Sequence, residues 1–267
     1  MGTNWREIDT CAKKWINEAG ERIKASFHTE LFIQTKSSRT DLVTNMDKEI
    51  EKFFKHKINE VFPTHKILGE EETGHHLEKL DGIVWIIDPI DGTMNFIHQQ
   101  RNFAISIGVY QDGKGILGYI YDVVHNELYY AQKGEGAYLN GVLLPKLEEV
   151  SMEESVIAIN ASWLLPKNNI QSEAAVSLIK SVRGTRSFGS AALELASVAT
   201  GRIDAYLSKR LAPWDYGGGA ILIEEVGGIV TDMQGNRLDM LSGSSLLVAR
   251  PGLHNQILKM FNSVKNP

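Results

Sequence analysis

The stretch from Ile83 to Phe96, Ile-Val-Trp-Ile-Ile-Asp-Pro-Ile-Asp-Gly-Thr-Met-Asn-Phe, constrains the fold of this chain more than any other. Its first five residues are apolar and mostly β-branched, which is typical of a short strand buried on both faces. We expect that strand to end at Asp88, because the following proline fixes its own φ and keeps the residue before it extended. Asp91, Gly92 and Thr93 then add a second carboxylate, a permissive backbone position and a hydroxyl. The stretch therefore predicts two carboxylates and a hydroxyl at the end of a rigid strand.

Two interpretations of this stretch remain open when it is taken alone. Asp91 could be the N-cap of a short helix, which would leave the amides of Gly92 and Thr93 free to meet an anion. Asp-Pro-x-Asp-Gly is also typical of an ordinary surface turn. Two further acidic stretches of the chain are needed to decide between them.

Length and composition limit the classes of protein to be considered. A chain of 267 residues with 43% hydrophobic content suits one large domain or two subdomains with an ample core. The net charge of −5 and the pI near 5.9 argue against nonspecific binding to nucleic acid or to a membrane surface. A single cysteine, Cys11, excludes a disulfide framework and favours a reducing compartment. With no signal-peptide core and no apolar run of membrane-spanning length, we expect a cytoplasmic protein.

The periodicity of apolar residues differs between the two halves of the chain. In residues 1–144 it predicts helices over 5–23 and from Asp47 to Val61, then an antiparallel meander with strands over 103–110, 115–121, 127–131 and 136–139. In residues 145–267 strands alternate with helices, the strands over 155–159, 203–207, 229–231 and 245–249 and the helices over 173–182, 190–198, 216–226 and 253–261. We therefore expect an N-terminal α+β subdomain over 1–144 and a C-terminal α/β subdomain over 145–267.

Two other stretches carry conspicuous acids or glycines. Gly69-Glu70-Glu71-Glu72 places three like charges side by side, which suits either a solvated turn or a ligand site. In Pro213–Gly228, Asp215 is a candidate helix N-cap, and three glycines follow after Tyr216. Each glycine in a helix costs about 1 kcal/mol relative to alanine, so the triplet suggests that another backbone comes very close.

The acids of the three stretches suggest one site. Glu70, Asp88, Asp91 and Asp215 each lie where a regular element begins or ends, and Asp47 at the start of the second helix is a fifth candidate. Carboxylates without histidine or cysteine select hard divalent ions, above all Mg²⁺. Bare carboxylates would repel one another and have raised pKa values, whereas divalent ions would convert the pocket into one that accepts phosphate.

These stretches resemble the signatures of a known family. Trp85–Phe96 resembles the first signature of the inositol monophosphatase family, Trp214–Gly228 resembles the second, and Gly69-Glu70-Glu71 resembles its metal-binding glutamate turn. The resemblance extends from Asp41 to Gly228. It implies a layered α-β-α-β-α sandwich of the inositol monophosphatase/fructose-1,6-bisphosphatase type, lithium-sensitive hydrolysis of phosphate monoesters with two or three Mg²⁺ ions, and a homodimer.

The same resemblance implies roles for individual residues. It assigns one Mg²⁺ to Glu70, Asp88 and the carbonyl of Ile90, a second to Asp88, Asp91 and Asp215, and a weaker third to Glu70 with waters. It assigns the phosphate to Asp91, Gly92 and Thr93, and the rest of the substrate to Ala191 and Asp215. Asp47 would orient Thr93, and Thr93 with Glu70 would activate the attacking water.

One departure from the family pattern affects the expected substrate. Family members that prefer inositol phosphates often carry an acid at the position of Ser208, which is followed here by Lys209 and Arg210. Inositol 1-phosphate is the expected substrate, and a broader phosphatase acting on NADP or fructose 1,6-bisphosphate is the alternative. A regulatory or scaffolding protein that retains the fold is an alternative of another class.

Overall fold

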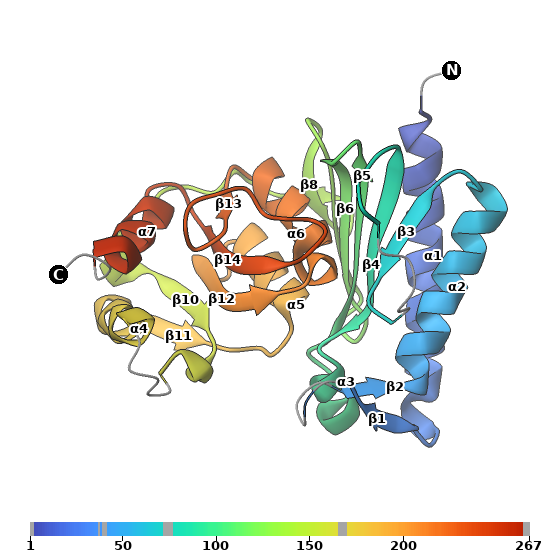
Figure 1. Ribbon diagram of the computed structural model, residues 1–267, viewed down its shortest axis with the longest axis horizontal. Coiled ribbons are helices and arrows are strands. Elements are labelled where there is room, and N and C mark those ends of the chain that lie inside the picture. Colours follow the sequence, from blue (N-terminus) through green and yellow to red (C-terminus); the bar gives the residue numbers. More distant parts are fainter. Residues whose placement is uncertain (1–2, 37, 39–41, 72–76, 165–169, 264–267) are drawn as a thin grey trace.

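Five layers of secondary structure, in the order α-β-α-β-α, make up the fold (Figure 1). The computed structural model describes residues 3–36, 38, 42–71, 77–164 and 170–263. The layered sandwich expected from the sequence is confirmed.

The first layer consists of two long helices, α1 (Trp5–Ala25) and α2 (Asn45–Val61). Both are amphipathic, so each buries one apolar stripe against the neighbouring sheet and leaves its polar face exposed. In α1 the buried stripe includes Trp15, whose ring lies 5.9 Å from that of Trp85 in the sheet. The helix predicted over residues 5–23 is thus present and is two residues longer.

The second layer is a seven-stranded sheet in the order β3-β4-β5-β6-β7-β8-β9. Its strands are β3 (Lys66–Gly69), β4 (Ile83–Asp91), β5 (Ala104–Gln111), β6 (Lys114–Asp122), β7 (Glu127–Gln132), β8 (Gly136–Leu139) and β9 (Val142–Leu143). Only β3 and β4 run parallel, and the remaining neighbours form the expected antiparallel meander.

Strand β4 does not end at Asp88 as expected. It continues to Asp91, and its pairing with β5 shifts register between Asp88 and Asp91. A proline cannot donate a ladder hydrogen bond, and such an irregularity is where a sheet tolerates one. The shift keeps both carboxylates at the end of the sheet.

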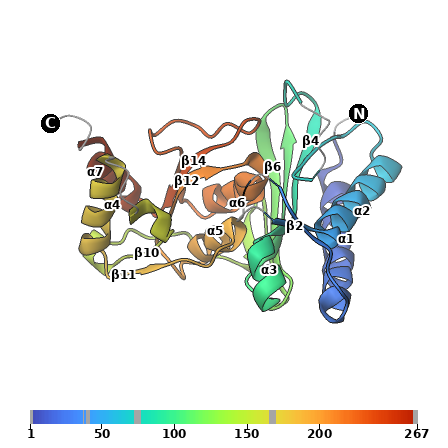
Figure 2. The ribbon, with the colours of Figure 1, turned by 60° about the horizontal axis from the view of Figure 1, so that its bottom comes forward.

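The third layer lies between the two sheets and contains α5 (Ala191–Ala199) and α6 (Pro213–Glu225) (Figure 2). The glycines of α6 lie directly on the backbone of the large sheet. A Cβ atom added to Gly218 would lie 2.7 Å from the carbonyl oxygens of Ile107 and Tyr119. One added to Gly118 of β6 would lie 2.3 Å from the carbonyl of Gly218. The close backbone approach expected from the glycine triplet is confirmed.

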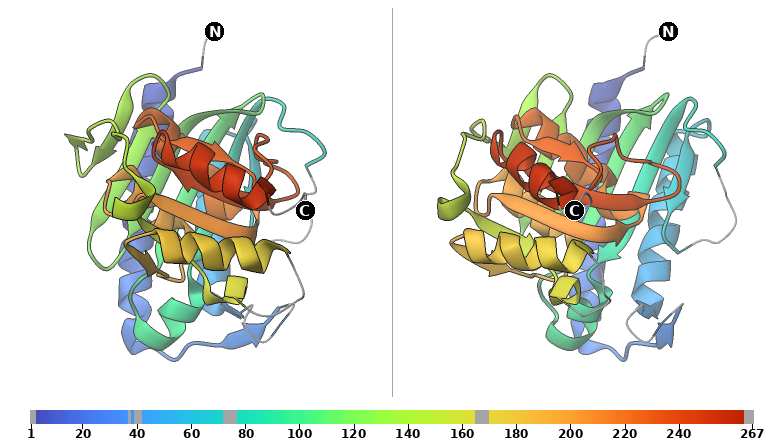
Figure 3. Two further views of the ribbon diagram at one scale, coloured as in Figure 1. Left: turned by 90° about the vertical axis from the view of Figure 1, so that its left-hand side faces the viewer. Right: turned by 60° about the vertical axis from the view of Figure 1, so that its left-hand side comes forward.

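The fourth and fifth layers belong to the second half of the chain. A five-stranded mixed sheet has the order β11-β10-β12-β14-β13 and contains β10 (Val156–Ile159), β11 (Gly184–Arg186), β12 (Ala205–Leu211), β13 (Ile229–Thr231) and β14 (Ser244–Ala249). Its outer face is covered by α4 (Ile170–Ser181) and α7 (Leu253–Ser263), which lie side by side (Figure 3).

The shorter elements include a two-stranded hairpin and one short α-helix near the end of β4. The hairpin pairs β1 (Ile33–Thr35) with β2 (Leu42–Thr44), and α3 spans Thr93–Gln99. Three 3₁₀ turns cover Ser26–His28, Met152–Glu154 and Ala161–Leu164. Within the described part of the chain, no helix combines the length and apolarity needed to cross a membrane.

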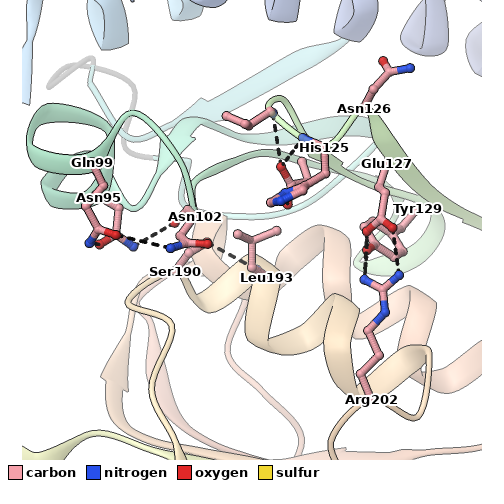
Figure 4. A network of polar contacts seen from close by, with 12 residues as sticks. Asn95, Gln99, Asn102, His125, Asn126, Glu127, Tyr129, Ser190, Leu193 and Arg202 are labelled. Atoms are coloured by element: carbon pink, nitrogen blue, oxygen red, sulfur yellow. Dashed lines mark hydrogen bonds and ion pairs between the residues drawn. The ribbon is translucent and has the colours of Figure 1, made fainter.

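The two halves of the chain share part of their core. Val84 and Ile86 of the large sheet belong to the same buried cluster as Leu222 of α6 and Val248 of β14. At the periphery, the two terminal guanidinium nitrogens of Arg202 each donate to a carboxylate oxygen of Glu127 in β7 at 2.8 Å (Figure 4). The division at residues 144 and 145 stays a prediction, and neither half buries all its apolar surface alone.

Candidate metal and phosphate site

Asp88 and Asp91 lie at the end of β4, where both are almost fully buried. Oδ1 of Asp88 accepts a hydrogen bond from the backbone N–H of Ile90 at 3.0 Å. Oδ2 of Asp91 accepts from the backbone N–H of Ala192 at 2.7 Å and from the hydroxyl of Ser190. The start of α5 therefore fixes the orientation of Asp91 from the other half of the chain.

Asp215 reaches the same place from the first turn of α6. The sequence predicted Asp215 as the N-cap of that helix, and this prediction is wrong. Helix α6 begins earlier, with Ala212 as its N-cap and Pro213 as its first residue. From the third helical position, Oδ2 of Asp215 accepts the backbone N–H of Ala212 at 2.7 Å. Asp88, Asp91 and Asp215 each contribute one carboxylate oxygen to a cluster. These three oxygens lie within 4.8 Å of one another.

Glu70 follows β3, beside the end of β4. Its Oε1 accepts from the ammonium of Lys36 at 2.8 Å, and the same ammonium lies 2.5 Å from Oε1 of Glu71. Glu51 of α2 accepts the backbone N–H of Glu71 at 2.7 Å. Glu72, His75 and His76 lie outside the described residues. Glu70 thus faces the cluster while a lysine from the segment after β1 balances part of its charge.

Asp47 and Thr93 form a buried pair behind the carboxylates. Asp47 has no exposed surface; its Oδ1 accepts from the hydroxyl of Thr93 at 3.0 Å, and its Oδ2 accepts the backbone N–H of Thr44 at 2.8 Å. The carbonyl of Ile90 is a second acceptor for the Thr93 hydroxyl at 3.1 Å. Asp47 therefore holds Thr93 in a fixed orientation. It does so from the third position of α2, inside a capping box with Thr44.

Gly92 makes the turn between β4 and α3. It has φ of +96° and is the N-cap of α3, so the expectation that Asp91 caps this helix is wrong. A Cβ atom at Gly92 would lie 3.2 Å from the backbone carbonyls of both Asn102 and Gly189. The positive φ and the close carbonyls both favour glycine at this turn.

Burial and mutual repulsion raise the pKa values of the clustered acids. The pKa of Asp88 is well above its usual range, mainly because of burial and then because of the charges on Glu70, Asp91 and Asp215. Burial also raises the pKa of Asp215, with the charge of Asp91 next in size. Burial raises the pKa of Asp91 to about 6, although the hydrogen bonds from Ser190 and Ala192 oppose the shift. The clustered carboxylates therefore repel one another when they are ionised, and a bound cation would reduce this repulsion.

The clustered residues line a cavity of about 210 Å³. Its walls include every residue expected to hold metal or phosphate, namely Glu70, Asp88, Ile90, Asp91, Gly92, Thr93 and Asp215. Asp47 lies behind Thr93 rather than on the wall. An all-oxygen set of this kind, crowded and short of positive charge, fits Mg²⁺ better than a transition metal.

A second depression of about 610 Å³ adjoins the first and shares Asp91, Gly189 and Asp215 with it. Ala191, Ser208, Lys209 and Arg210 line this depression. The ammonium of Lys209 lies 4.9 Å from the centre of the Trp163 ring and donates to the carbonyl of Ser162 at 3.2 Å. Arg210 is exposed and also borders the neighbouring surface at Trp214 and Asp215. Of the two cations, Arg210 is the one placed to meet a ligand.

The structure also brings in residues that the sequence alone did not single out as site residues. Lys36, Glu51 and Ser190 contact Glu70, Glu71 and Asp91 as described above. Glu194 of α5 is buried, and its Oε1 accepts the backbone N–H of Phe188 at 2.6 Å. This hydrogen bond holds the loop that carries Gly189 and Ser190.

Asn95 holds the same loop from its other side. The side-chain amide of Asn95 donates to the carbonyl of Phe188 at 2.7 Å, close to Asn102 and Ser190 in Figure 4. Nothing in the sequence near these residues signals their partners.

Comparison with known proteins places these features in context. The model of the inositol monophosphatase family matches residues 4–266. The inositol-1-monophosphatase of Bacillus subtilis is 56% identical over 259 residues, which cover 97% of this chain and 98% of that protein. The crystal structure of inositol monophosphatase II from Staphylococcus aureus has a TM-score of 0.87 at 43% identity, covering 95% of this chain and 92% of that one. A structure of an IMPase/NADP phosphatase complexed with Mg²⁺ and phosphate has a TM-score of 0.90 at 29% identity, covering 98% and 97%.

Proposed function

We propose, from the premise that this chain belongs to the inositol monophosphatase family, that it is a Mg²⁺-dependent phosphate monoester hydrolase acting on inositol 1-phosphate. The observation that supports this most is the meeting of Asp88, Asp91 and Asp215 within 4.8 Å in the cavity that Thr93 also lines. The name of the Bacillus subtilis relative supports the choice of inositol 1-phosphate.

Glu70, Asp88, the carbonyl of Ile90, Asp91 and Asp215 would hold two or three Mg²⁺ ions. Their oxygens are of the type that Mg²⁺ prefers. Burial and neighbouring charges raise the pKa values of Asp88 and Asp215, and a bound cation would counteract that effect. When bound, Mg²⁺ supplies positive charge that lets a phosphate dianion enter and lowers the pKa of water. We expect lithium to inhibit by entering one of these positions.

The remaining steps belong to the chain's own residues. Asp47 accepts from the hydroxyl of Thr93, so a lone pair of that hydroxyl is left to orient the attacking water. Glu70 would accept the water's proton, because it lies beside the cluster and retains a second carboxylate oxygen besides the one that meets Lys36. The backbone N–H groups of Gly92 and Thr93 would bind phosphate oxygens. As the bond from phosphorus to the leaving oxygen breaks, that oxygen would take a proton from water, and the resulting alcohol would occupy the depression lined by Ala191.

An assay of phosphate release tests the proposal. The substrates are inositol 1-phosphate, fructose 1,6-bisphosphate, NADP and 3′-phosphoadenosine 5′-phosphate, each with Mg²⁺ and with EDTA. Asp88→Asn should abolish turnover of all of them, because an amide is a much weaker ligand than a carboxylate for the divalent ions that Asp88 would hold, whereas Glu71→Gln should retain most activity. Near-normal Mg²⁺-dependent turnover by Asp88→Asn would contradict the assignment of Asp88 as a metal ligand. No release from any ester by the folded protein with Mg²⁺ would favour the scaffolding alternative.

Arg210 supports a second candidate, a broader phosphatase that accepts a second anionic group. Arg210→Ala should raise KM for NADP and fructose 1,6-bisphosphate roughly tenfold or more, since a charge-assisted contact is worth about 1.5–3 kcal/mol. KM for inositol 1-phosphate should change little. Lys209→Ala is the matched control, because Lys209 is engaged by Trp163 and Ser162. Equal effects of Arg210→Ala on both kinds of substrate would restrict the enzyme to inositol phosphate.

The homodimer and the cytoplasmic location expected from the sequence remain proposals. The family resemblance supports the dimer, and the single cysteine supports a reducing compartment. Sedimentation of the purified chain would distinguish a dimer from a monomer.

A further inference from the structure

A separate cavity of about 210 Å³ lies toward the C-terminal end of α6, away from the carboxylates. It is enclosed by the hairpin between β5 and β6, the turn after β7, the end of α6 and the segment that follows β13. Its apolar lining includes Ile221, Leu238 and Met240, together with the buried ring of Tyr110. It shares no lining residue with the cavity at Asp88.

The rim of this cavity is positively charged. Lys114, Lys133 and Arg237 line it from three different segments, whereas Glu224 is the one carboxylate among its lining residues. The chain as a whole carries a net charge of −5, so the excess of cations around this cavity has the opposite sign to the net charge of the protein. The ion pairs and hydrogen bonds found among the described residues include none from these three cationic side chains. Three exposed cations around a hollow attract and retain an anion.

The size and lining of the cavity limit the ligand. A volume of about 210 Å³ has room for an anion the size of phosphate or pyrophosphate, because one water occupies about 30 Å³ in the liquid. Lysine ammonium groups and an arginine fork are the donors that phosphate oxygens favour. Because the described residues that line this cavity include a single carboxylate, that of Glu224, no cation has to bind before an anion can enter. We propose that this cavity is a second binding site for a small phosphate-type anion, and that this site needs no metal ion.

The position of Tyr110 connects this cavity with α6. Its ring lines the cavity, and its hydroxyl donates to the backbone carbonyl of Gly217 at 2.8 Å. Gly217 lies two residues after Asp215 in the first turns of the helix. An anion held here therefore lies against the side chain that supports the turn carrying Asp215.

Calorimetric titration of the full chain with pyrophosphate in EDTA tests this proposal independently of the proposed function. Without divalent ions the carboxylates at Asp88 repel an anion, so binding reports on the second cavity. We expect one pyrophosphate per chain. The variant K114Q/K133Q/R237Q should bind pyrophosphate at least about tenfold more weakly, because it loses the charge-assisted hydrogen bonds that the three cations would make.

Two further variants make the result decisive. K14Q/K52Q/K180Q removes three exposed cations elsewhere and should bind like the wild type. Glu224→Gln should tighten binding several-fold, because it removes the one opposing charge. Circular dichroism would confirm that each variant is folded. Absence of binding to the wild type, or equal weakening in the two triple variants, would overturn the proposal, whatever the outcome of the phosphatase assay.

Discussion

Asp47 shows how one buried side chain can serve the fold and the site together. Its Oδ2 closes the capping box of α2 with Thr44, and its Oδ1 holds the hydroxyl of Thr93. Among the described residues, the three groups that hydrogen-bond to this carboxylate, the N–H and hydroxyl of Thr44 and the hydroxyl of Thr93, are all donors. Burial raises its pKa, yet the hydrogen bonds from Thr44 and Thr93 favour the charged form.

Asp47→Asn should therefore impair turnover although it changes so few atoms. The amide nitrogen would face a donor on one side or the other, so Thr93 would lose its fixed orientation. We expect kcat for inositol 1-phosphate to fall about 10- to 100-fold with little change in KM, as small misplacements in a site do. Steady-state kinetics would measure this, with Thr93→Ser as a control that keeps the hydroxyl and most of the activity. An unchanged kcat in Asp47→Asn would show that Thr93 needs no such partner.

At the scale of one element, α6 brings Asp215 to the site because its glycines let it approach the large sheet. Gly218 lies where any side chain would collide with the backbone of β5 and β6, whereas a Cβ atom at Gly217 would meet Ile86 at 3.3 Å. The two neighbouring glycines of one helix thus differ in how much space they have.

Alanine at these two positions should change the free energy of unfolding by different amounts. Alanine favours a helix over glycine by about 1 kcal/mol, so Gly217→Ala should leave the free energy of unfolding nearly unchanged. Gly218→Ala should lower it by about 2 kcal/mol or more, because rigid carbonyls cannot move aside cheaply. Urea unfolding of both variants measures the difference. Equal stability of the two would mean that α6 can shift away from the sheet without loss.

The same helix shows what the sequence can predict and what it cannot. The glycine triplet predicted a neighbouring backbone because only such a neighbour explains its cost. The position of the helix start was wrong by three residues, since Asp215 caps the helix from within and Ala212 gives no signal. Lys36 and Ser190 could not have been assigned partners, because their contacts depend on how distant segments pack. Motifs fixed by local backbone chemistry were predictable, and contacts between the two halves were not.

At the scale of the whole molecule, the buried acids make stability depend on pH. Burial raises the pKa of Asp91 to about 6 and that of Glu194 to about 7, whereas carboxyls in an unfolded chain titrate at about 4. The unfolded chain therefore ionises first as pH rises. In consequence the free energy of unfolding falls as pH rises from about 4 through about 7.

Thermal unfolding in EDTA at pH 5 and at pH 8 should show this loss as a lower Tm at pH 8. With Mg²⁺ present the drop should be smaller, because the charge that appears on Asp91 is then balanced. Glu194→Gln should reduce the drop with and without Mg²⁺, since that residue is not among the expected ligands. A Tm in EDTA that rises between pH 5 and pH 8 would contradict these burial effects.

The expected ligands of the site come from three separate segments, the ends of β3 and β4 and the start of α6. They meet only when α6 lies between the two sheets, and we expect such contacts between distant segments to form late in folding. Divalent ions therefore have no complete site to bind while the chain is still folding. Any stabilisation by Mg²⁺ would therefore act on the native state, so we expect bound Mg²⁺ to slow unfolding and to leave the folding rate nearly unchanged.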